Sequence, residues 1–246
     1  MAFRNQTMRT KNPFFRFKQF TVWHDQSALK VCTEACILGA YVSVEGFRYG
    51  LDIGAGTGLL SLMMAQRNRA IEISAVEIDE ASYRQATMNI QQSDFGSQIK
   101  LYHSSIQDWE PKDSRLYELI VSNPPFFANH LPSTHQRRNR ALHTETLTLE
   151  ELWESVRRLI APKGRFVVLL PPYETQRLVE VAGKTAFVPV RQCNIYQKLD
   201  KPLFRQITTF ERENRPCEVQ NLYIHNADGT YAQSFKDLLQ DYYLNF

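Results

Sequence analysis

A glycine-rich turn at residues 54–58 constrains the fold of this chain more than any other feature. It follows an apolar run at residues 49–53, which predicts a buried strand, and it precedes a helical pattern that opens near Leu59. The turn carries three glycines at alternate positions: Gly54, Gly56 and Gly58. Without a Cβ the backbone can approach a ligand closely, and the first amides of the helix are unpaired donors. Strand, turn and helix together predict a nucleotide-type pocket at the carboxyl edge of a sheet.

The residues around the turn indicate which nucleotide it accepts. A dinucleotide fingerprint requires a glycine where this chain has Leu59, which disfavours a nicotinamide-dependent dehydrogenase. Asp52 would repel a pyrophosphate and suits a ligand that carries an amine or a sulfonium. The next apolar run, residues 71–76, leads to Glu77, where an acid would bind a ribose diol, and the adjacent Ile78 is a further candidate cofactor contact. Asp52, the glycines and Glu77 resemble the first two motifs of the Rossmann-like S-adenosylmethionine-dependent methyltransferases.

The alternation of strand and helix patterns predicts an α/β fold. Helices are expected at 59–67, 80–92, 148–160, 174–184 and 234–243, and strands at 71–77, 99–102, 117–122 and 165–170. Segments 187–197, 204–212 and 219–225 alternate as antiparallel edge strands would. We therefore predict a Rossmann-like class I methyltransferase fold: a mostly parallel seven-stranded sheet with antiparallel C-terminal strands and helices on both faces.

Length and composition fit one domain over residues 1–246, with 43% apolar residues and a formal net charge of +3. No apolar run approaches the ~20 residues needed to span a bilayer, and the N-terminus lacks a signal-peptide core, so we expect a cytoplasmic protein with no membrane contact. The four cysteines form no CxxC pair and no histidine lies at zinc-ligand spacing. We expect reduced cysteines, no metal and a monomer.

Residues 1–24 form a basic and aromatic N-terminal arm, with five cations, five phenylalanines and no acid. Cations suit phosphates and flat rings suit bases, so the arm is a candidate RNA contact through Arg16 and Lys18. A solvated tail whose later aromatics pack on the domain explains the composition equally well. Residues 25–46 show a helical pattern that predicts a lid over the cofactor pocket, and Thr33 is a candidate contact. Asp25 or Ser27 could cap the start of the helix, and Thr33 could start a second piece after a break. An exposed helix face explains Thr33 almost as well.

The loop after the third expected strand contains Gln107 and Asp108. In Rossmann-like methyltransferases an acid or amide from this loop usually meets the adenine amine of the cofactor, and either residue could supply the acceptor. A helix cap is an alternative interpretation of Asp108 with comparable weight.

A second strong signal is the sequence that ends the strand at 117–122: Asn123, Pro124, Pro125 and Phe126. The two prolines cannot continue a ladder of hydrogen bonds and they fix φ, so this strand end is rigid. An exocyclic adenine amine is a poor nucleophile, because its lone pair is delocalised into the ring. The Asn123 side-chain oxygen and the Pro124 carbonyl would accept hydrogen bonds from the two N–H groups of this amine. These bonds favour a pyramidal nitrogen whose lone pair faces the methyl donor. Asn123 is therefore also a candidate cofactor contact. Phe126 would stack on the base, and transfer is a direct displacement governed by proximity and orientation.

Basic residues elsewhere are further candidate RNA contacts. The segment 127–143, which follows the proline pair, presents Arg137, Arg138 and Arg140 beside the expected target pocket. Lys201 and Arg205 lie near the connection between two of the expected edge strands. A solvated loop is the alternative interpretation of the arginine-rich segment.

Nearly the whole chain resembles one family more closely than the class. The resemblance rests on the segments 17–22, 24–25, 38–40, 52–58, 123–126, 140–143 and 241–244. The family is the bacterial enzymes that methylate the exocyclic N6 amine of the adenine beside the anticodon in valine tRNA. The resemblance implies a cytosolic, S-adenosylmethionine-dependent enzyme with a tRNA substrate, and it implicates Asp52, Gly54, Gly56, Glu77 and Asn123. Relatives often carry an acid where this chain has Ser105, and Asp108 is the nearest substitute.

Other functions share the Asn-Pro-Pro-aromatic motif. The targets are DNA adenine, the N2 amine of ribosomal guanine, and glutamine side chains of release factors. The basic, aromatic N-terminus favours nucleic acid over a protein glutamine. A module that binds S-adenosylmethionine without transferring its methyl group is an alternative of another class, and Asn123 and Phe126 argue against it.

Overall fold

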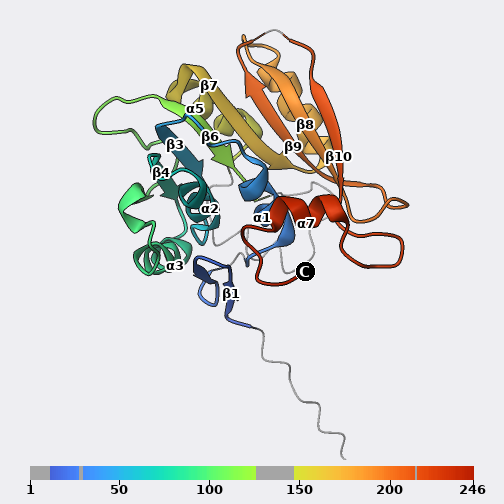
Figure 1. Ribbon diagram of the computed structural model, residues 1–246. Coiled ribbons are helices and arrows are strands. Elements are labelled where there is room, and N and C mark those ends of the chain that lie inside the picture. The colour runs from blue at the N-terminus through green and yellow to red at the C-terminus, as the bar shows by residue number, and fades with distance from the viewer. Residues whose placement is uncertain (1–11, 28–29, 126–146, 214) are drawn as a thin grey trace, which may run out of the picture.

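The computed structural model describes residues 12–27, 30–125, 147–213 and 215–246. In this part of the chain, eight strands form one sheet in the order β10-β8-β9-β7-β6-β3-β4-β5 (Figure 1). The strands are β3 (Tyr49–Ile53), β4 (Glu72–Glu77), β5 (Ile99–His103), β6 (Tyr117–Ser122), β7 (Ile160–Leu170), β8 (Val188–Tyr196), β9 (Leu203–Glu211) and β10 (Glu218–Tyr223).

The directions of these strands confirm the mostly parallel α/β fold and correct two details of the prediction. β7, β6, β3, β4 and β5 pair in parallel, β9 is antiparallel to both β7 and β8, and β10 is parallel to β8. Among the described strands, β9 alone is therefore reversed, and the expectation that 219–225 is an antiparallel edge strand is wrong. The sheet also has eight strands where seven were expected, because β10 crosses over to cover the backbone edge that β8 would otherwise expose.

Helices cover both faces of the sheet, as Figure 1 shows. On one face α1 (Thr33–Tyr41), α2 (Leu59–Arg67), α3 (Glu80–Gln91) and α7 (Gln233–Leu239) contribute to one buried apolar cluster. On the other face α5 (Leu149–Leu159) and α6 (Pro172–Ala182) contribute to a second cluster. A short 3₁₀ helix, Gly96–Gln98, precedes β5. None of the described helices is long and apolar enough to cross a membrane.

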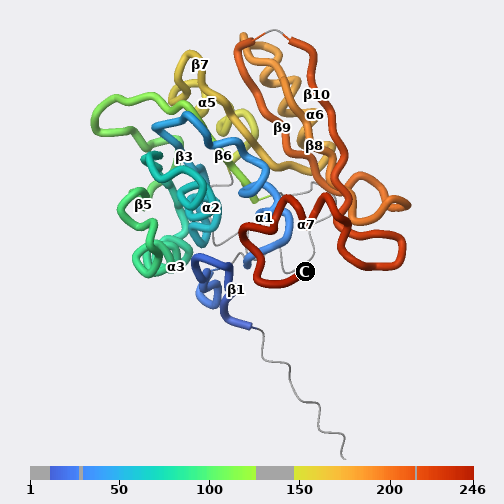
Figure 2. The backbone as a smooth tube through the Cα atoms, viewed as in Figure 1, coloured from blue at the N-terminus to red at the C-terminus, as the bar shows by residue number. Residues whose placement is uncertain are grey.

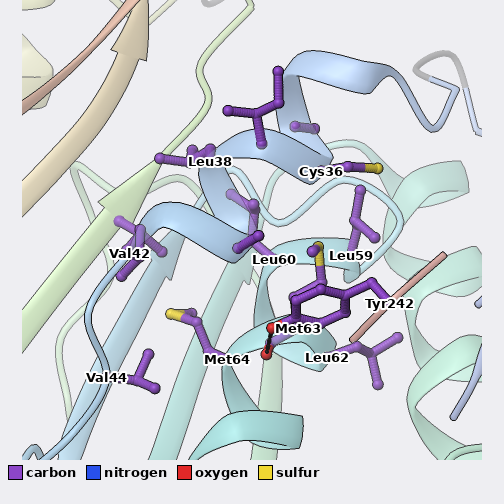
Figure 3. Close-up of a cluster of buried hydrophobic side chains, with 14 of the residues drawn as sticks. Cys36, Leu38, Val42, Val44, Leu59, Leu60, Leu62, Met63, Met64 and Tyr242 are labelled. Atoms are coloured by element: carbon purple, nitrogen blue, oxygen red, sulfur yellow. Dashed lines mark hydrogen bonds between the residues drawn. The ribbon is translucent and has the colours of Figure 1, made fainter. Parts of the chain in front are cut away.

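The C-terminal segment is joined to the first cluster beside the contact between α1 and α2 (Figure 3). Gly39 of α1 allows a close approach, because a Cβ there would lie 2.4 Å from the sulfur of Met63. The hydroxyl of the buried Tyr242 donates a hydrogen bond of 2.9 Å to the Met63 carbonyl. The closing residues of the chain therefore form part of the core.

The described part of the N-terminal arm packs on the domain. A hairpin of β1 (Phe14–Arg16) and β2 (Thr21–Trp23) lies beside the C-terminal segment (Figure 2). Phe17 and Phe20 are buried, and the Lys18 amide donates to the Tyr242 carbonyl at 2.8 Å. The alternative that the later aromatics pack on the domain is therefore correct for these rings, whereas residues 1–11 lie outside the described part of the chain.

The helical pattern predicts a helix from residue 25, and the structure confirms only the part that starts at Thr33. Residues 25–27 form bends, and the helix α1 begins only at Thr33. Polar groups explain the difference, since buried side chains of α3 bind the segment. The Gln26 amide donates to the Gln85 side-chain oxygen at 3.0 Å, and the hydroxyls of Ser27 and Ser82 lie 3.0 Å apart.

Asn89 of α3 makes the strongest of these connections. Its side-chain oxygen accepts from the Trp23 amide, and its side-chain nitrogen donates to the carbonyls of Trp23 and Thr57, each at 2.9 Å. The side chain is 1% exposed. One buried amide therefore joins the N-terminal hairpin to the glycine-rich turn.

Replacing Asn89 with alanine should lower the free energy of unfolding by about 3 kcal/mol, because three buried hydrogen bonds are lost and the Trp23 amide is left without a partner. Urea unfolding measures this change. The matched control is Gln91→Ala, an exposed position on the same helix, which should change stability by less than about 0.5 kcal/mol. Equal effects of the two substitutions would contradict the structural role of Asn89.

Candidate functional site

The candidate site lies where the central parallel strands end. Ile53 is paired directly with Ser122, so the glycine-rich turn and Asn123 leave neighbouring strands at the same level. The Ser122 hydroxyl donates to the Ile53 carbonyl at 2.9 Å and holds these two strand ends together. The arrangement agrees with the expectation that the turn and the proline pair share one edge of the sheet.

The conformation of the turn requires glycine. Gly54, Gly56 and Gly58 have φ values of +74°, +56° and +81°, a region that is unfavourable for other residues. A Cβ at Gly54 or Gly56 would meet no atom of the described residues within 4 Å. At Gly58, by contrast, it would contact Ala86 and Ile90 of α3 at 3.5 Å. The first two glycines therefore border open space that a ligand can fill, and the third packs against a helix.

Asp52 is a fully buried carboxylate below this space. Its Oδ2 accepts from the Ser61 amide at 3.1 Å and from the Ser61 hydroxyl at 2.7 Å, whereas its buried Oδ1 has no hydrogen-bond partner in the described part of the chain. Burial, with a smaller contribution from the charge of Glu77, raises the pKa of Asp52 to about 7. A cationic group of a ligand would partner the free oxygen and stabilise the charged form.

Glu77 ends β4 beside the turn. Its Oε2 accepts from the Gly56 amide at 2.7 Å and its Oε1 accepts from the Asp79 amide at 2.8 Å. Burial is the main cause that raises the pKa of this carboxyl. The next side chain, Ile78, is 52% exposed, which leaves an apolar surface beside the carboxylate.

The loop after β5 brings Ser105 and Asp108 together. The Ser105 hydroxyl donates to Asp108 Oδ2 at 2.7 Å, and the Asp108 amide donates back to the Ser105 hydroxyl at 3.2 Å. Ser105 therefore positions the carboxyl that was expected to replace the missing acid, and Asp108 itself is exposed. Gln107 is half-buried in the same loop.

Sequence reasoning missed the residue that holds this loop. Arg158, near the end of α5, donates to the carbonyls of Ile106 at 3.0 Å, Gln107 at 3.3 Å and Trp109 at 3.0 Å. Its guanidinium also lies 3.8 Å from the Glu110 carboxylate. No local pattern marks Arg158, because a basic residue in the last turn of a helix is ordinary and its partners lie about fifty positions earlier in the sequence.

The structure describes the Asn-Pro-Pro-aromatic motif only in part. Asn123 is half-buried, Pro124 is buried and Pro125 is exposed. Phe126 and the three arginines Arg137, Arg138 and Arg140 lie outside the described residues. Thr33 is the first residue of α1 and is half-buried.

The other expected RNA contacts lie at two places. β8 and β10 run in the same direction as β7, so the connection with Lys201 and the start of β9 with Arg205 are at the carboxyl edge near Asn123. Arg16 and Lys18 lie in the N-terminal hairpin instead, where the Lys18 ammonium donates to the Gln240 carbonyl at 2.5 Å and Arg16 is exposed. Lys18 thus has a structural contact in addition to any role toward RNA.

No described group of three or more histidine, cysteine, aspartate or glutamate side chains is arranged to hold a metal ion. All four cysteines are free thiols.

Comparison with known proteins agrees with this geometry. The family model described as "Methyltransferase small domain" matches residues 35–169, more than half of the chain. A solved structure of a predicted O-methyltransferase from Agrobacterium tumefaciens has a TM-score of 0.64 at 14% identity and covers 84% of this chain and 95% of that one. At this identity, the likeness shows the fold alone.

Curated relatives match almost the full length. The tRNA1(Val) (adenine(37)-N6)-methyltransferase of Dyadobacter fermentans is 44% identical over 240 residues, which are 96% of this chain and 99% of the relative. The protein of the same name from Proteus mirabilis is 38% identical over 237 residues, 94% of each chain. With this identity, this coverage and the matching domain model, the chain belongs to the tRNA1(Val) (adenine(37)-N6)-methyltransferase family.

Proposed function

We propose that this protein transfers the methyl group of S-adenosylmethionine to the N6 amine of adenine 37, beside the anticodon of valine tRNA. The observation that carries the proposal is the pairing of Ile53 with Ser122, which sets the glycine-rich turn next to Asn123. The names of the full-length relatives support the substrate. We further propose that it acts in the cytoplasm as a single-domain monomer over residues 1–246.

The residues of the turn fit the cofactor. Asp52 Oδ1, which has no partner among the described residues, would accept a hydrogen bond from the amino group of the cofactor's methionine half. Gly54 and Gly56 border the space that this half of the cofactor would fill. Glu77 would bind the ribose hydroxyls and Ile78 would contact the purine. Gln107 or Asp108 would accept from the adenine amine, with Thr33 as a further contact from α1. When bound, S-adenosylmethionine supplies a methyl group on an electrophilic sulfonium.

Asn123 and the prolines would prepare the target amine. The Asn123 side-chain oxygen and the Pro124 carbonyl would accept hydrogen bonds from the two N–H groups of the amine. These bonds would orient the lone pair of its nitrogen toward the cofactor side of the edge. Pro125 restricts the backbone, so the acceptors are positioned before the base arrives. Phe126 would stack on the adenine plane and hold it in line.

The RNA would approach the carboxyl edge. Lys201 and Arg205 are placed there by β8 and β9 and would contact the phosphates near the anticodon. Arg137, Arg138 and Arg140 follow the catalytic motif in the sequence and would add contacts on the same side. Arg16 and Lys18 of the hairpin would contact a more distant part of the tRNA.

Asn123→Ala should reduce methyl transfer to tRNA by at least about 100-fold, because an acceptor that orients the amine is lost. The affinity for S-adenosylhomocysteine should change by less than about threefold. Labelled-methyl transfer followed by nucleoside mass spectrometry measures the first quantity, and calorimetry measures the second. Transfer that persists near the wild-type rate would show that Asn123 does not have the assigned role.

Cofactor affinity should rise with pH as Asp52 ionises. The pKa of Asp52 is about 7 without ligand, and a bound ammonium group favours the carboxylate, so binding below this pH releases a proton. The Kd of S-adenosylhomocysteine should therefore fall between about pH 5.5 and 7 and level off above. Glu77, whose pKa is also raised, acts in the same direction.

The control for the pH dependence is Asp52→Asn, which cannot ionise. It should bind more weakly at about pH 7.5 and lose most of the pH dependence. Calorimetry in two buffers with different ionisation enthalpies counts the protons released. A wild-type affinity that is constant over this range, or that falls with rising pH, would contradict the placement of the amine at Asp52.

Arg158→Ala should weaken S-adenosylhomocysteine binding about tenfold, because the loop that meets the adenine loses its connections to α5. At saturating cofactor, kcat should stay within about twofold. The neighbouring Arg157 is the matched control, since it pairs with Glu154 of its own helix at 3.5 Å and is exposed. Arg158→Ala should weaken the binding of 5′-methylthioadenosine, which lacks the amino-acid half, by the same factor as the binding of S-adenosylhomocysteine. An unchanged affinity for 5′-methylthioadenosine would separate Arg158 from the adenine loop.

A further inference from the structure

Two neighbouring strands of the sheet end in the same residue pattern. β6 is followed by Asn123 and then by Pro124-Pro125-Phe126, and β7 is followed by Pro171-Pro172-Tyr173. The strands pair in parallel with Ser122 opposite Val168. In this register the two proline pairs are offset by one position, so both leave the same edge of the sheet. Only the first of them carries a functional expectation from the sequence.

The backbone that carries Tyr173 is fixed. Pro172 begins α6, and the Pro171 carbonyl accepts from both the amide and the hydroxyl of Thr175, at 2.9 and 3.1 Å. Arg177 forms an ion pair of 3.2 Å with Glu150 of α5. The first turn of α6 is therefore closed on its N-cap, and its second turn is paired with the neighbouring helix.

The side chain of Tyr173 nevertheless faces water, with 62% of its surface exposed. Single exposed aromatic rings occur on many surfaces, and here the position is the informative part. The ring stands at the carboxyl edge, one strand away from the end of β6 and Asn123. A ring carried by the start of a helix at this place can receive another flat group on its exposed face.

Positive charge lies on the other side of the same strand end. β9 is antiparallel to β7 with Gln206 opposite Leu170, so Arg205 is next to the start of the Pro171-Pro172 pair. The Arg205 guanidinium stacks over the ring of Phe204, with 4.2 Å to the ring centroid. The exposed Lys201 precedes this strand in the β8–β9 connection. Arg205 pairs with Ile195 on the sheet face of the first cluster, whereas α6 covers the other face, so the ring and the cations flank one strand end from the two faces of the sheet. Aromatic rings and cations that line one path are the combination that binds a single-stranded nucleic acid.

We propose that Tyr173 stacks on the unpaired base next to the target adenine in the anticodon loop. The proposal rests on the proposed function, since an adenine whose N6 enters the site must leave the stack of its neighbours. The adjacent base then loses a stacking partner, and Tyr173 replaces it from the neighbouring strand end. Arg205 and Lys201 would neutralise the phosphates of the same nucleotides. Tyr173 is thus a substrate-binding residue that contacts the RNA and not the reacting atoms.

Steady-state kinetics on full-length valine tRNA test the contact through three variants. Tyr173→Ala should raise KM for tRNA about tenfold, with kcat within about threefold and an unchanged affinity for S-adenosylhomocysteine. Tyr173→Phe keeps the ring and should stay within about twofold of wild type in KM. Val219→Ala, a change at a 60% exposed apolar position on the outer strand β10, is the control and should have no effect. Melting temperatures show that each variant is folded.

A cycle with modified RNA identifies the stacking partner. Anticodon stem-loops with an abasic nucleotide on the 5′ or the 3′ side of adenine 37 remove one neighbouring base at a time. For the wild-type protein, kcat/KM on one of these abasic RNAs should be about tenfold lower than on the intact RNA. For Tyr173→Ala, kcat/KM should be nearly the same on that abasic RNA and on the intact one, because the stacking contact is already lost. Additive losses on both RNAs, or a KM of Tyr173→Ala within twofold of wild type, would overturn the stacking proposal. A wild-type protein that transfers no methyl group to adenine 37 would instead overturn the proposed function.

Discussion

The parallel pairing of β3 with β6 at the centre of the sheet is the interaction on which the rest of the site depends. Paired strands lie about 4.8 Å apart, so groups that follow directly after Ile53 and Ser122 are neighbours whatever the loops do afterwards. One strand continues into a turn open to a nucleotide, and the other into an amide and two prolines. The hydrogen bond between Ser122 and the Ile53 carbonyl fixes the last residues before both.

The turn is held from three sides by polar side chains. The Glu77 carboxylate accepts from the Gly56 amide, Asn89 donates to the Thr57 carbonyl, and Asp52 accepts from Ser61 at the start of α2. These bonds spare the cofactor most of the cost of ordering the backbone that it contacts. The same side chain of Asn89 holds the N-terminal hairpin, so the first described residues and the turn form one unit.

Sequence patterns predicted the parts of the site that depend on neighbouring residues. The glycine turn, Glu77 and the Asn-Pro-Pro motif each stand at the end of an apolar strand, which a local sequence pattern reveals. All three lie at the expected strand ends. Long-range pairings escaped prediction: the parallel addition of β10 beside β8, and the reach of Arg158 from α5 to the loop after β5. The helical pattern fails at residues 25–27, which form bends bound by Gln85 and Ser82 of α3.

In the proposed reaction, Asn123 binds the amine of a base beside a cofactor that lies on the glycine turn. The most direct measurement is a structure of this protein with S-adenosylhomocysteine and the valine tRNA anticodon stem-loop. We expect the adenine N6 to lie within about 3 Å of the Asn123 side-chain oxygen and to face the ligand's sulfur. An adenine bound elsewhere, or a cofactor on the opposite edge of the sheet, would contradict it.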